Sequence, residues 1–264
     1  MRNRLESWGL AAAGLIVAAL AAIVGPLAPQ AQQPGRAGDF DYYALVLSWS
    51  PTYCADVGAG RGDPQCSGRR PYAFVLHGLW PQYARGYPSD CRVSFNTFVP
   101  GPVADGILDI MPSKKLVFHE YRKHGTCSGL EPRAYFDTAR KFYNHVKIPA
   151  RFQALDAPIT TSVAEIAQEF MTANPSMRRE MLGVVCSRPN RVQEVRICFS
   201  KDGAFKTCGR NEDADRLCRA KSLIMPPTRG GTRDAARGSS SRGSSPRGPL
   251  PSPLPGPTQP ERRI

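Results

Sequence analysis

The stretch FVLHGLWPQ, residues 74–82, begins with an apolar run and ends with Trp80, Pro81 and Gln82. Extended back to Tyr72, the run reads YAFVLH, whose length and composition predict a strand at the centre of a sheet, buried on both faces. The run stops at Gly78. His77 is therefore expected where a strand ends beside a loop, a position from which its side chain can emerge from the sheet.

The segments around this strand mix strands and helices. Residues 41–50 are rich in aromatic and β-branched side chains and predict a second strand, which Pro51 ends. A Gly-, Asp- and Arg-rich loop is expected over residues 52–70. Four helices are expected, over residues 103–111, 115–123, 133–146 and 161–172. A hairpin is expected from residues 192–200 and 204–208, which flank an Asp-Gly turn. Because strands and helices do not alternate strictly, the sequence predicts an α+β fold with an antiparallel sheet.

The two ends of the chain differ in composition from its middle. A positively charged start precedes an apolar run from Gly9 to Ala28, which predicts a secretory signal peptide at residues 1–31. The run is long enough that an uncleaved membrane anchor remains the alternative. Residues 226–264 contain nine Pro, six Gly and no aromatic residue, which predicts a disordered tail. One domain, residues 38–225, lies between them.

The net charge of the chain is +13. The predicted tail contributes +5 and residues 1–36 contribute +2, so the predicted domain keeps about +6. A moderately basic domain suits a polyanionic partner such as nucleic acid, although many periplasmic proteins are also basic. For the tail, a solvated segment without a dedicated partner is favoured over an anchor for nucleic acid or the cell surface.

All the cysteines lie in the predicted domain, and they number eight: Cys54, Cys66, Cys91, Cys127, Cys186, Cys198, Cys208 and Cys218. Their even number and a signal peptide predict four disulfides formed in an oxidising compartment, so we expect a secreted or periplasmic protein. No CxxC pair is present, whereas metal-binding thiols are usually spaced that closely. The spacing alone leaves the pairing open.

A second segment, HEYRKHGTC at residues 119–127, concentrates titratable side chains. His119 and His124 are five residues apart, which is about 140° around a helix, so they do not form the pair of a zinc protease. Glu120 precedes Lys123 by three residues and His124 by four. On a helix these spacings bring a carboxylate, an ammonium and an imidazole to one face.

The residue types in these two segments suit acid–base chemistry on a phosphate ester. Two imidazoles can act as acid and base, and an ammonium can stabilise developing negative charge. No GxSxG motif provides a protein nucleophile, but RNA carries its own nucleophile, the ribose 2′-hydroxyl. A different hydrolase, including a metal-dependent one, remains an alternative on these residues alone. His145, on a predicted helix among apolar neighbours, is expected to be structural or at the surface.

Both segments also resemble those of a known family. FVLHGLWPQ resembles the first active-site segment of the T-two ribonuclease family, the acid and self-incompatibility ribonucleases. HEYRKHGTC resembles the second, with Tyr121 where Trp is common. The resemblance extends to LSWSPTYC at residues 47–54 and to the cysteine pattern. It covers the predicted domain and neither end of the chain.

The resemblance implies a metal-independent endoribonuclease without a cofactor, on a fold with a central antiparallel sheet flanked by helices. It implies that His77 is the general acid and His124 the general base, while Glu120 and Lys123 stabilise the transition state. The products would be 2′,3′-cyclic phosphates, later hydrolysed to 3′-phosphates. A monomer acting on RNA is expected, with no membrane contact once the signal peptide is removed.

The resemblance also implies a substrate site and a disulfide pattern. His119 would hold the phosphate, and Trp80 would stack on the base upstream of the scissile bond. Gln82 occupies a position that helps to choose the base in many family members, and base preference stays open. The implied disulfides are Cys54–Cys66, Cys91–Cys127, Cys186–Cys218 and Cys198–Cys208. An RNA-binding or cytotoxic relative whose main role is not catalysis is the alternative, but it would not need the full catalytic set.

Overall fold

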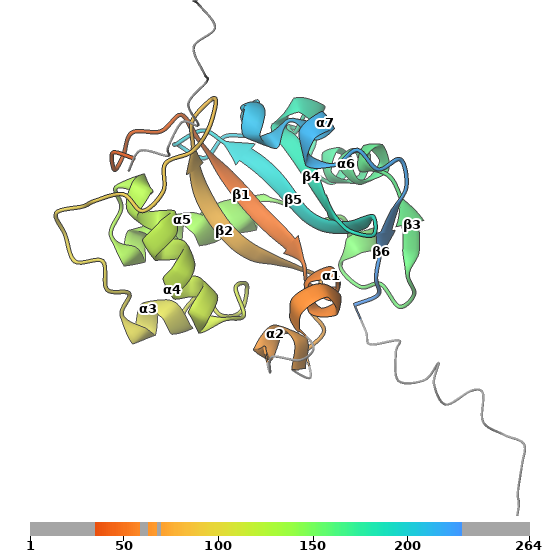
Figure 1. The fold of residues 1–264 in the computed structure, drawn as a ribbon, viewed down its shortest axis with the longest axis horizontal. Coiled ribbons are helices and arrows are strands. Elements are labelled where there is room, and N and C mark those ends of the chain that lie inside the picture. The colour runs from red at the N-terminus through yellow and green to blue at the C-terminus, as the bar shows by residue number, and fades with distance from the viewer. Residues whose placement is uncertain (1–34, 59–62, 68–69, 229–264) are drawn as a thin grey trace, which may run out of the picture.

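The structure is a computed structural model and describes residues 35–58, 63–67 and 70–228 (Figure 1). The predicted signal peptide, residues 1–31, lies outside the described residues, as does the predicted tail from residue 229 onward.

The described fold continues three residues past the predicted domain boundary at residue 225. The indole N–H of Trp49 donates to the carbonyl of Pro226, 3.1 Å away. The main-chain N–H of Thr228 donates to the carbonyl of Leu155, and the Leu155 N–H donates to the Thr228 hydroxyl. These hydrogen bonds attach the end of the last strand to the rest of the domain.

A six-stranded sheet forms the centre of the fold (Figure 1). Its strands are β1 (Tyr42–Trp49), β2 (Phe74–Gln82), β3 (Ile159–Thr161), β4 (Leu182–Ser187), β5 (Arg191–Phe199) and β6 (Leu223–Met225). The strand order is β2-β1-β5-β6-β3, and β4 also pairs with β5. All pairings are antiparallel except that of β5 with β6. The predicted α+β class and the central sheet flanked by helices are therefore confirmed.

Seven α-helices accompany the sheet in the described part of the chain. They are α1 (Ser50–Tyr53), α2 (Pro64–Ser67), α3 (Gly101–Asp105), α4 (Lys114–Lys123), α5 (Pro132–His145), α6 (Val163–Ala173) and α7 (Ala214–Leu217). The predictions of α4, α5 and α6 are correct to within two residues at each end. The helix predicted over residues 103–111 ends at Asp105, and the predicted loop over residues 52–70 contains the end of α1 and all of α2.

The hydrophobic core lies between one face of the sheet and helices α5 and α6. Phe142 of α5 meets Tyr43 edge-on at 5.7 Å, and Phe170 of α6 meets Phe74 at 5.8 Å. Burying each aromatic side chain contributes about 1.5–3 kcal/mol. A second, small buried cluster holds Tyr42, Ala44 and Cys198, and the polar side chains of β2 and β5 that line the functional site lie on the face opposite the main core.

The prediction that residues 72–77 form a central strand is wrong, because β2 lies at the edge of the sheet and continues to Gln82. Its outer edge is covered by side chains and loops rather than by another strand. The Tyr135 hydroxyl donates to the Leu79 carbonyl at 2.8 Å, and the Leu76 N–H donates to the carbonyl of Ile110. Such coverage buries an edge strand as fully as a central one.

The hairpin predicted from residues 192–200 and 204–208 is present only at its turn end, where Phe199 and Phe205 form an isolated antiparallel bridge. β5 pairs on its two sides with β1 and with β4, a strand that was not predicted. The pairing with β4 ends at Ile197, and beyond it the following segment pairs briefly with the end of β5, where the Lys206 N–H donates to the Cys198 carbonyl. The short strands β3 and β6 were not predicted either.

The disulfide pattern is as the family resemblance implies. The bonds join Cys54 to Cys66, Cys91 to Cys127, Cys186 to Cys218 and Cys198 to Cys208.

A membrane-spanning helix would have to be long and apolar, and none of the helices within residues 35–58, 63–67 and 70–228 meets both conditions.

Candidate active site

A β-bulge in β2 sets the direction of the His77 side chain. In the pairing of β1 with β2, Gly78 and Leu76 have partners but His77 between them has none. Side chains alternate between the faces of a strand, so without this extra residue His77 would share the core face with Leu79. With it, His77 joins the polar face, on which Trp80 also lies.

The C-terminal end of α4 supplies the second group of side chains. Glu120 lies in the last turn and is 1% exposed, and His124 caps the helix and is 4% exposed. Lys123 is half-buried and His119 is exposed. Glu120, Lys123 and His124 line the same cavity, as their spacing on the helix predicted.

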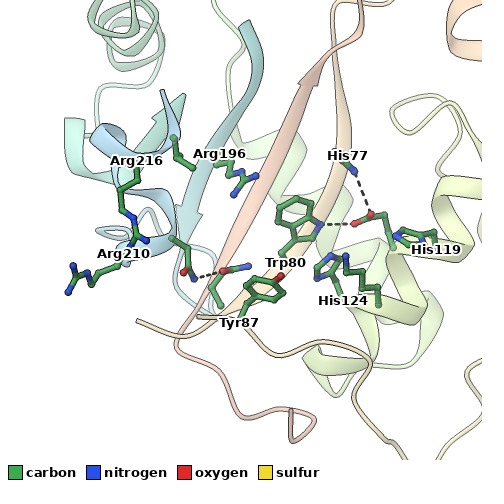
Figure 2. Close-up of a pocket in the computed structure, with 13 residues that line it drawn as sticks. His77, Trp80, Tyr87, His119, His124, Arg196, Arg210 and Arg216 are labelled. Atoms are coloured by element: carbon green, nitrogen blue, oxygen red, sulfur yellow. Dashed lines mark hydrogen bonds and ion pairs between the residues drawn. The ribbon is translucent and has the colours of Figure 1, made fainter. Parts of the chain in front are cut away.

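Contacts among these side chains join β2 to α4 (Figure 2). The Trp80 indole N–H donates to Glu120 Oε2 at 2.6 Å, and His77 Nε2 lies 3.6 Å from Glu120 Oε1. The His124 ring stacks on Trp80, with centroids 4.8 Å apart. A Cβ at Gly78 would lie 2.2 Å from Glu120 Oε2, so glycine is the residue that lets helix and strand approach this closely.

All seven residues predicted for the site line one cavity of about 540 Å³. They are His77, Trp80, Gln82, His119, Glu120, Lys123 and His124. Gln82 is buried, and its Oε1 accepts a hydrogen bond from Asn211 Nδ2 at 2.7 Å. His145 lies apart from this cavity, with its ring against Phe205 at 4.9 Å, as expected of a structural residue.

The two imidazoles, His124 buried and His77 half-buried, have opposite electrostatic surroundings. Burial, with the nearby charges of Lys123 and His77, lowers the pKa of His124 to about 3. Burial alone would also lower the pKa of His77, but the hydrogen bond to Glu194 and the carboxylates of Glu120 and Glu194 outweigh it and raise that pKa. At neutral pH, His124 is therefore neutral, and His77 binds a proton more readily than an ordinary imidazole.

Burial is also the main influence on Glu120. It raises the pKa of this carboxyl group, against the opposing effects of His77, the Trp80 hydrogen bond and Lys123. Burial together with Lys123 lowers the pKa of His119. The site thus contains both proton donors and proton acceptors near neutral pH.

Several residues of the cavity were missed in the sequence. Its remaining lining residues are Tyr87, Arg196, Arg210, Asn211, Arg216 and Leu217. Glu194 lies just behind His77 and bonds to it. Glu194 and Arg196 are two residues apart within a predicted strand, and this alternation could have indicated a polar sheet face. The segment containing Arg210 and Asn211 carries no comparable pattern.

In the described part of the chain, no group of three or more His, Cys, Asp or Glu side chains is arranged to hold a metal ion. His119 and His124 do not form such a group with a third ligand, and they differ in exposure.

Comparison with known proteins extends the resemblance of the two segments to most of the domain. Residues 40–208 match the Ribonuclease T2 family. A ribonuclease of Aeromonas hydrophila is 37% identical over 194 residues, covering 71% of this chain and 85% of that protein. Ribonuclease DdI of Dictyostelium discoideum is 29% identical over 183 residues, covering 64% of this chain and 78% of that protein.

Solved structures share the fold. An RNase-related protein from Calystegia sepium superposes with a TM-score of 0.56 at 22% identity, covering 72% of this chain and 98% of that one. Ribonuclease MC1 from bitter gourd seeds gives a TM-score of 0.54 at 24% identity, covering 70% of this chain and 99% of that one. The match over residues 40–208, which contains both histidine-bearing segments, shows that this chain belongs to the Ribonuclease T2 family and is an endoribonuclease.

Proposed function

We propose that the protein cleaves single-stranded RNA by transphosphorylation to a 2′,3′-cyclic phosphate, which it then hydrolyses to a 3′-phosphate, without a metal ion. One observation carries this proposal: two imidazoles with opposite pKa shifts line one cavity. A general base must be unprotonated and a general acid protonated at the start of the reaction. The lowered pKa of His124 suits the base and the raised pKa of His77 suits the acid.

In the first step, His124 accepts the proton of the ribose 2′-hydroxyl as the 2′-oxygen attacks phosphorus. The bond from phosphorus to the 5′-oxygen breaks, and His77 donates its proton to that leaving oxygen. In the second step the roles are exchanged, because His77 now lacks a proton and accepts one from a water molecule as the water oxygen attacks phosphorus. The bond from phosphorus to the 2′-oxygen breaks, and His124 returns its proton to that oxygen, which restores both imidazoles.

The other polar residues of the cavity stabilise the charge that develops on the phosphorane. Lys123 provides an ammonium, and His119 can donate a hydrogen bond to a phosphate oxygen. Glu120 holds the rings of His77 and Trp80 beside the cavity through its contacts with both, and the direct phosphate interactions are those of Lys123 and His119. These interactions strengthen as negative charge accumulates, which is the condition for accelerating the chemical step.

The base upstream of the scissile bond is assigned to the part of the cavity formed by Trp80 and Tyr87. His124 and Arg196 already contact the Trp80 ring, so the more exposed Tyr87 ring offers the larger stacking surface. Aromatic rings bind bases by stacking, whatever the sequence. Gln82 and its partner Asn211 add amide groups that can contact base edges. A variant of ribonuclease MC1, which shares this fold, has been solved in complex with 5′-UMP.

The four disulfides and the apolar N-terminal run support a protein that is exported and acts outside the cytoplasm as a secreted or periplasmic enzyme.

Two matched oligonucleotides test the proposed reaction in excess EDTA. One is DNA with a single ribonucleotide, and the other carries a 2′-O-methyl group at that nucleotide. We expect cleavage of the first alone, on the 3′ side of the ribonucleotide, with a 2′,3′-cyclic phosphate seen first by mass spectrometry and a 3′-phosphate later. Cleavage of the 2′-O-methyl strand, or activity lost in EDTA and restored by zinc, would contradict the proposal.

A further inference from the structure

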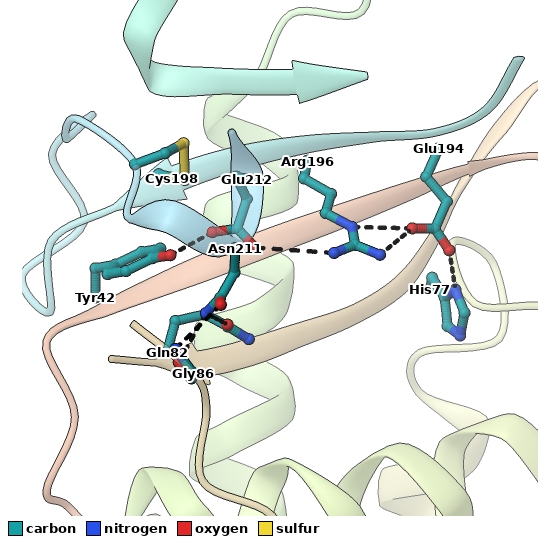
Figure 3. A network of polar contacts seen from close by, with 10 residues as sticks. Tyr42, His77, Gln82, Gly86, Glu194, Arg196, Cys198, Asn211 and Glu212 are labelled. Atoms are coloured by element: carbon teal, nitrogen blue, oxygen red, sulfur yellow. Dashed lines mark hydrogen bonds and ion pairs between the residues drawn. A yellow bond between two sulfur atoms is a disulfide. The ribbon is translucent and has the colours of Figure 1, made fainter. Parts of the chain in front are cut away.

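A buried carboxylate lies behind the proposed acid. Glu194 of β5 is 5% exposed, and its Oε1 lies 3.2 Å from His77 Nδ1 (Figure 3). The other ring nitrogen of His77, Nε2, points toward Glu120 in the cavity. The two nitrogens therefore have separate partners, one on the sheet and one on α4.

The Glu194 carboxylate is itself held in place by a guanidinium. Arg196 donates to Glu194 Oε2 through Nε at 3.0 Å and Nη2 at 2.9 Å. Because this two-point contact occupies Oε2, Oε1 remains directed at His77. A planar guanidinium imposes this geometry, which an ammonium would not.

Arg196 is fixed in turn by groups on both sides. Its guanidinium lies over the Trp80 ring, 4.9 Å from the centroid, and Nη1 is 3.9 Å from Glu212 Oε1. Glu212 is buried and accepts a hydrogen bond from the Tyr42 hydroxyl. The network therefore connects His77, through Glu194, with the aromatic ring assigned to base binding.

A purely structural ion pair would explain less of this geometry. Replacing such a buried pair by apolar residues is often neutral or stabilising, so burial of charge by itself is weak evidence of a structural role. Here the carboxylate is directed at a nitrogen of the residue that the β-bulge turns to the cavity side. That arrangement matches a base or acid oriented by a third group.

We propose that Glu194, held by Arg196, is the positioning residue of His77. The Nδ1–H of the imidazole donates to Glu194, which fixes the ring so that Nε2 carries the proton destined for the leaving 5′-oxygen. The negative charge of Glu194 also stabilises the imidazolium before that proton is transferred. This inference rests on the proposed function, in which His77 is the general acid.

The charges around His77 agree with this role. Glu194 and Arg196 face it from β5, and Glu120, His119 and His124 face it from α4 and its C-cap. The two carboxylates favour the protonated imidazole, and the three cationic or potentially cationic groups oppose it. Since the pKa of His77 is raised overall, the carboxylates prevail.

The test is Glu194→Gln, which keeps an oxygen able to accept from Nδ1 and removes the charge. We expect kcat to fall about 10- to 100-fold, as for other partners that orient a functional imidazole, with little change in KM. The alkaline limb of the kcat/KM profile should move to lower pH by about one unit, because an opposite charge no longer favours the imidazolium. A variant that only loses folded protein would lose the same fraction of activity at every pH, so the position of the alkaline limb would not change.

Two further variants complete the test. Glu194→Asp keeps the charge, so the alkaline limb of its kcat/KM profile should stay near the native position even if kcat is lower. Glu169→Gln neutralises a carboxylate paired with Arg151 outside the cavity, and should change neither kcat nor the profile. An alkaline limb that does not move in Glu194→Gln would overturn the positioning role. Cleavage by the native enzyme in EDTA decides the proposed function independently of that result.

Discussion

Replacing His124 by Ala should lower kcat/KM for RNA cleavage by about 10²–10⁴-fold, because a positioned general base contributes that much to the rate. The side chain is buried, and its lowered pKa keeps it neutral and able to accept the 2′-hydroxyl proton. The matched control is His145→Ala. His145 packs its ring against Phe199 and Phe205 outside the cavity, so this variant should keep near-native kcat/KM.

His77→Ala should cause a loss of similar size on RNA, but the two variants should differ with an activated substrate. A nucleoside 3′-phosphate ester of 4-nitrophenol has a leaving group that needs no proton. We expect this substrate to restore most of the activity of His77→Ala and none of that of His124→Ala. Initial rates with RNA and with the ester check this. Near-native RNA cleavage by His124→Ala, or rescue of that variant by the ester, would contradict the assignment.

The largest expected effect on stability comes from the Cys91–Cys127 disulfide. It joins the loop after β2 to the short helical turn after His124, across a sequence separation of 36 residues. Cys91→Ser with Cys127→Ser should lower the free energy of unfolding by about 4 kcal/mol, mainly by restoring chain entropy to the unfolded state.

The Cys198–Cys208 disulfide provides a comparison, because its sequence separation is only 10 residues. The corresponding double Ser variant should lose about 3 kcal/mol on the same loop-closure basis. Urea unfolding followed by tryptophan fluorescence measures both losses. If the Cys91 and Cys127 variant unfolds at the native midpoint, this disulfide does not stabilise the fold as described.

Local patterns in the sequence were sufficient for the helix that carries half of the site. The spacing of Glu120, Lys123 and His124 determines their common side of α4, whatever the rest of the fold does. The family resemblance correctly implied all four disulfides, which spacing alone did not determine. It also pointed to seven of the residues that line the cavity.

What the sequence did not reveal depends on contacts between distant segments. The face of β2 on which His77 lies follows from a bulge in its pairing with β1, and no residue pattern marks that bulge. The edge position of β2 follows from its coverage by Tyr135 and the Ile110 carbonyl, which come from other elements. Glu194 meets His77 only because β5 pairs with β1, which in turn pairs with β2.

The proposed reaction depends on two histidines held in opposite protonation states, which an NMR titration of the imidazole resonances measures. The chain has four His, so His77→Ala and His124→Ala assign the two signals. We predict that at pH 6.5, the ordinary imidazole pKa, His77 is mostly protonated and His124 is neutral, with the pKa of His124 near 3. If His124 titrates at or above the pKa of His77, the assignment of His124 as base and His77 as acid is wrong.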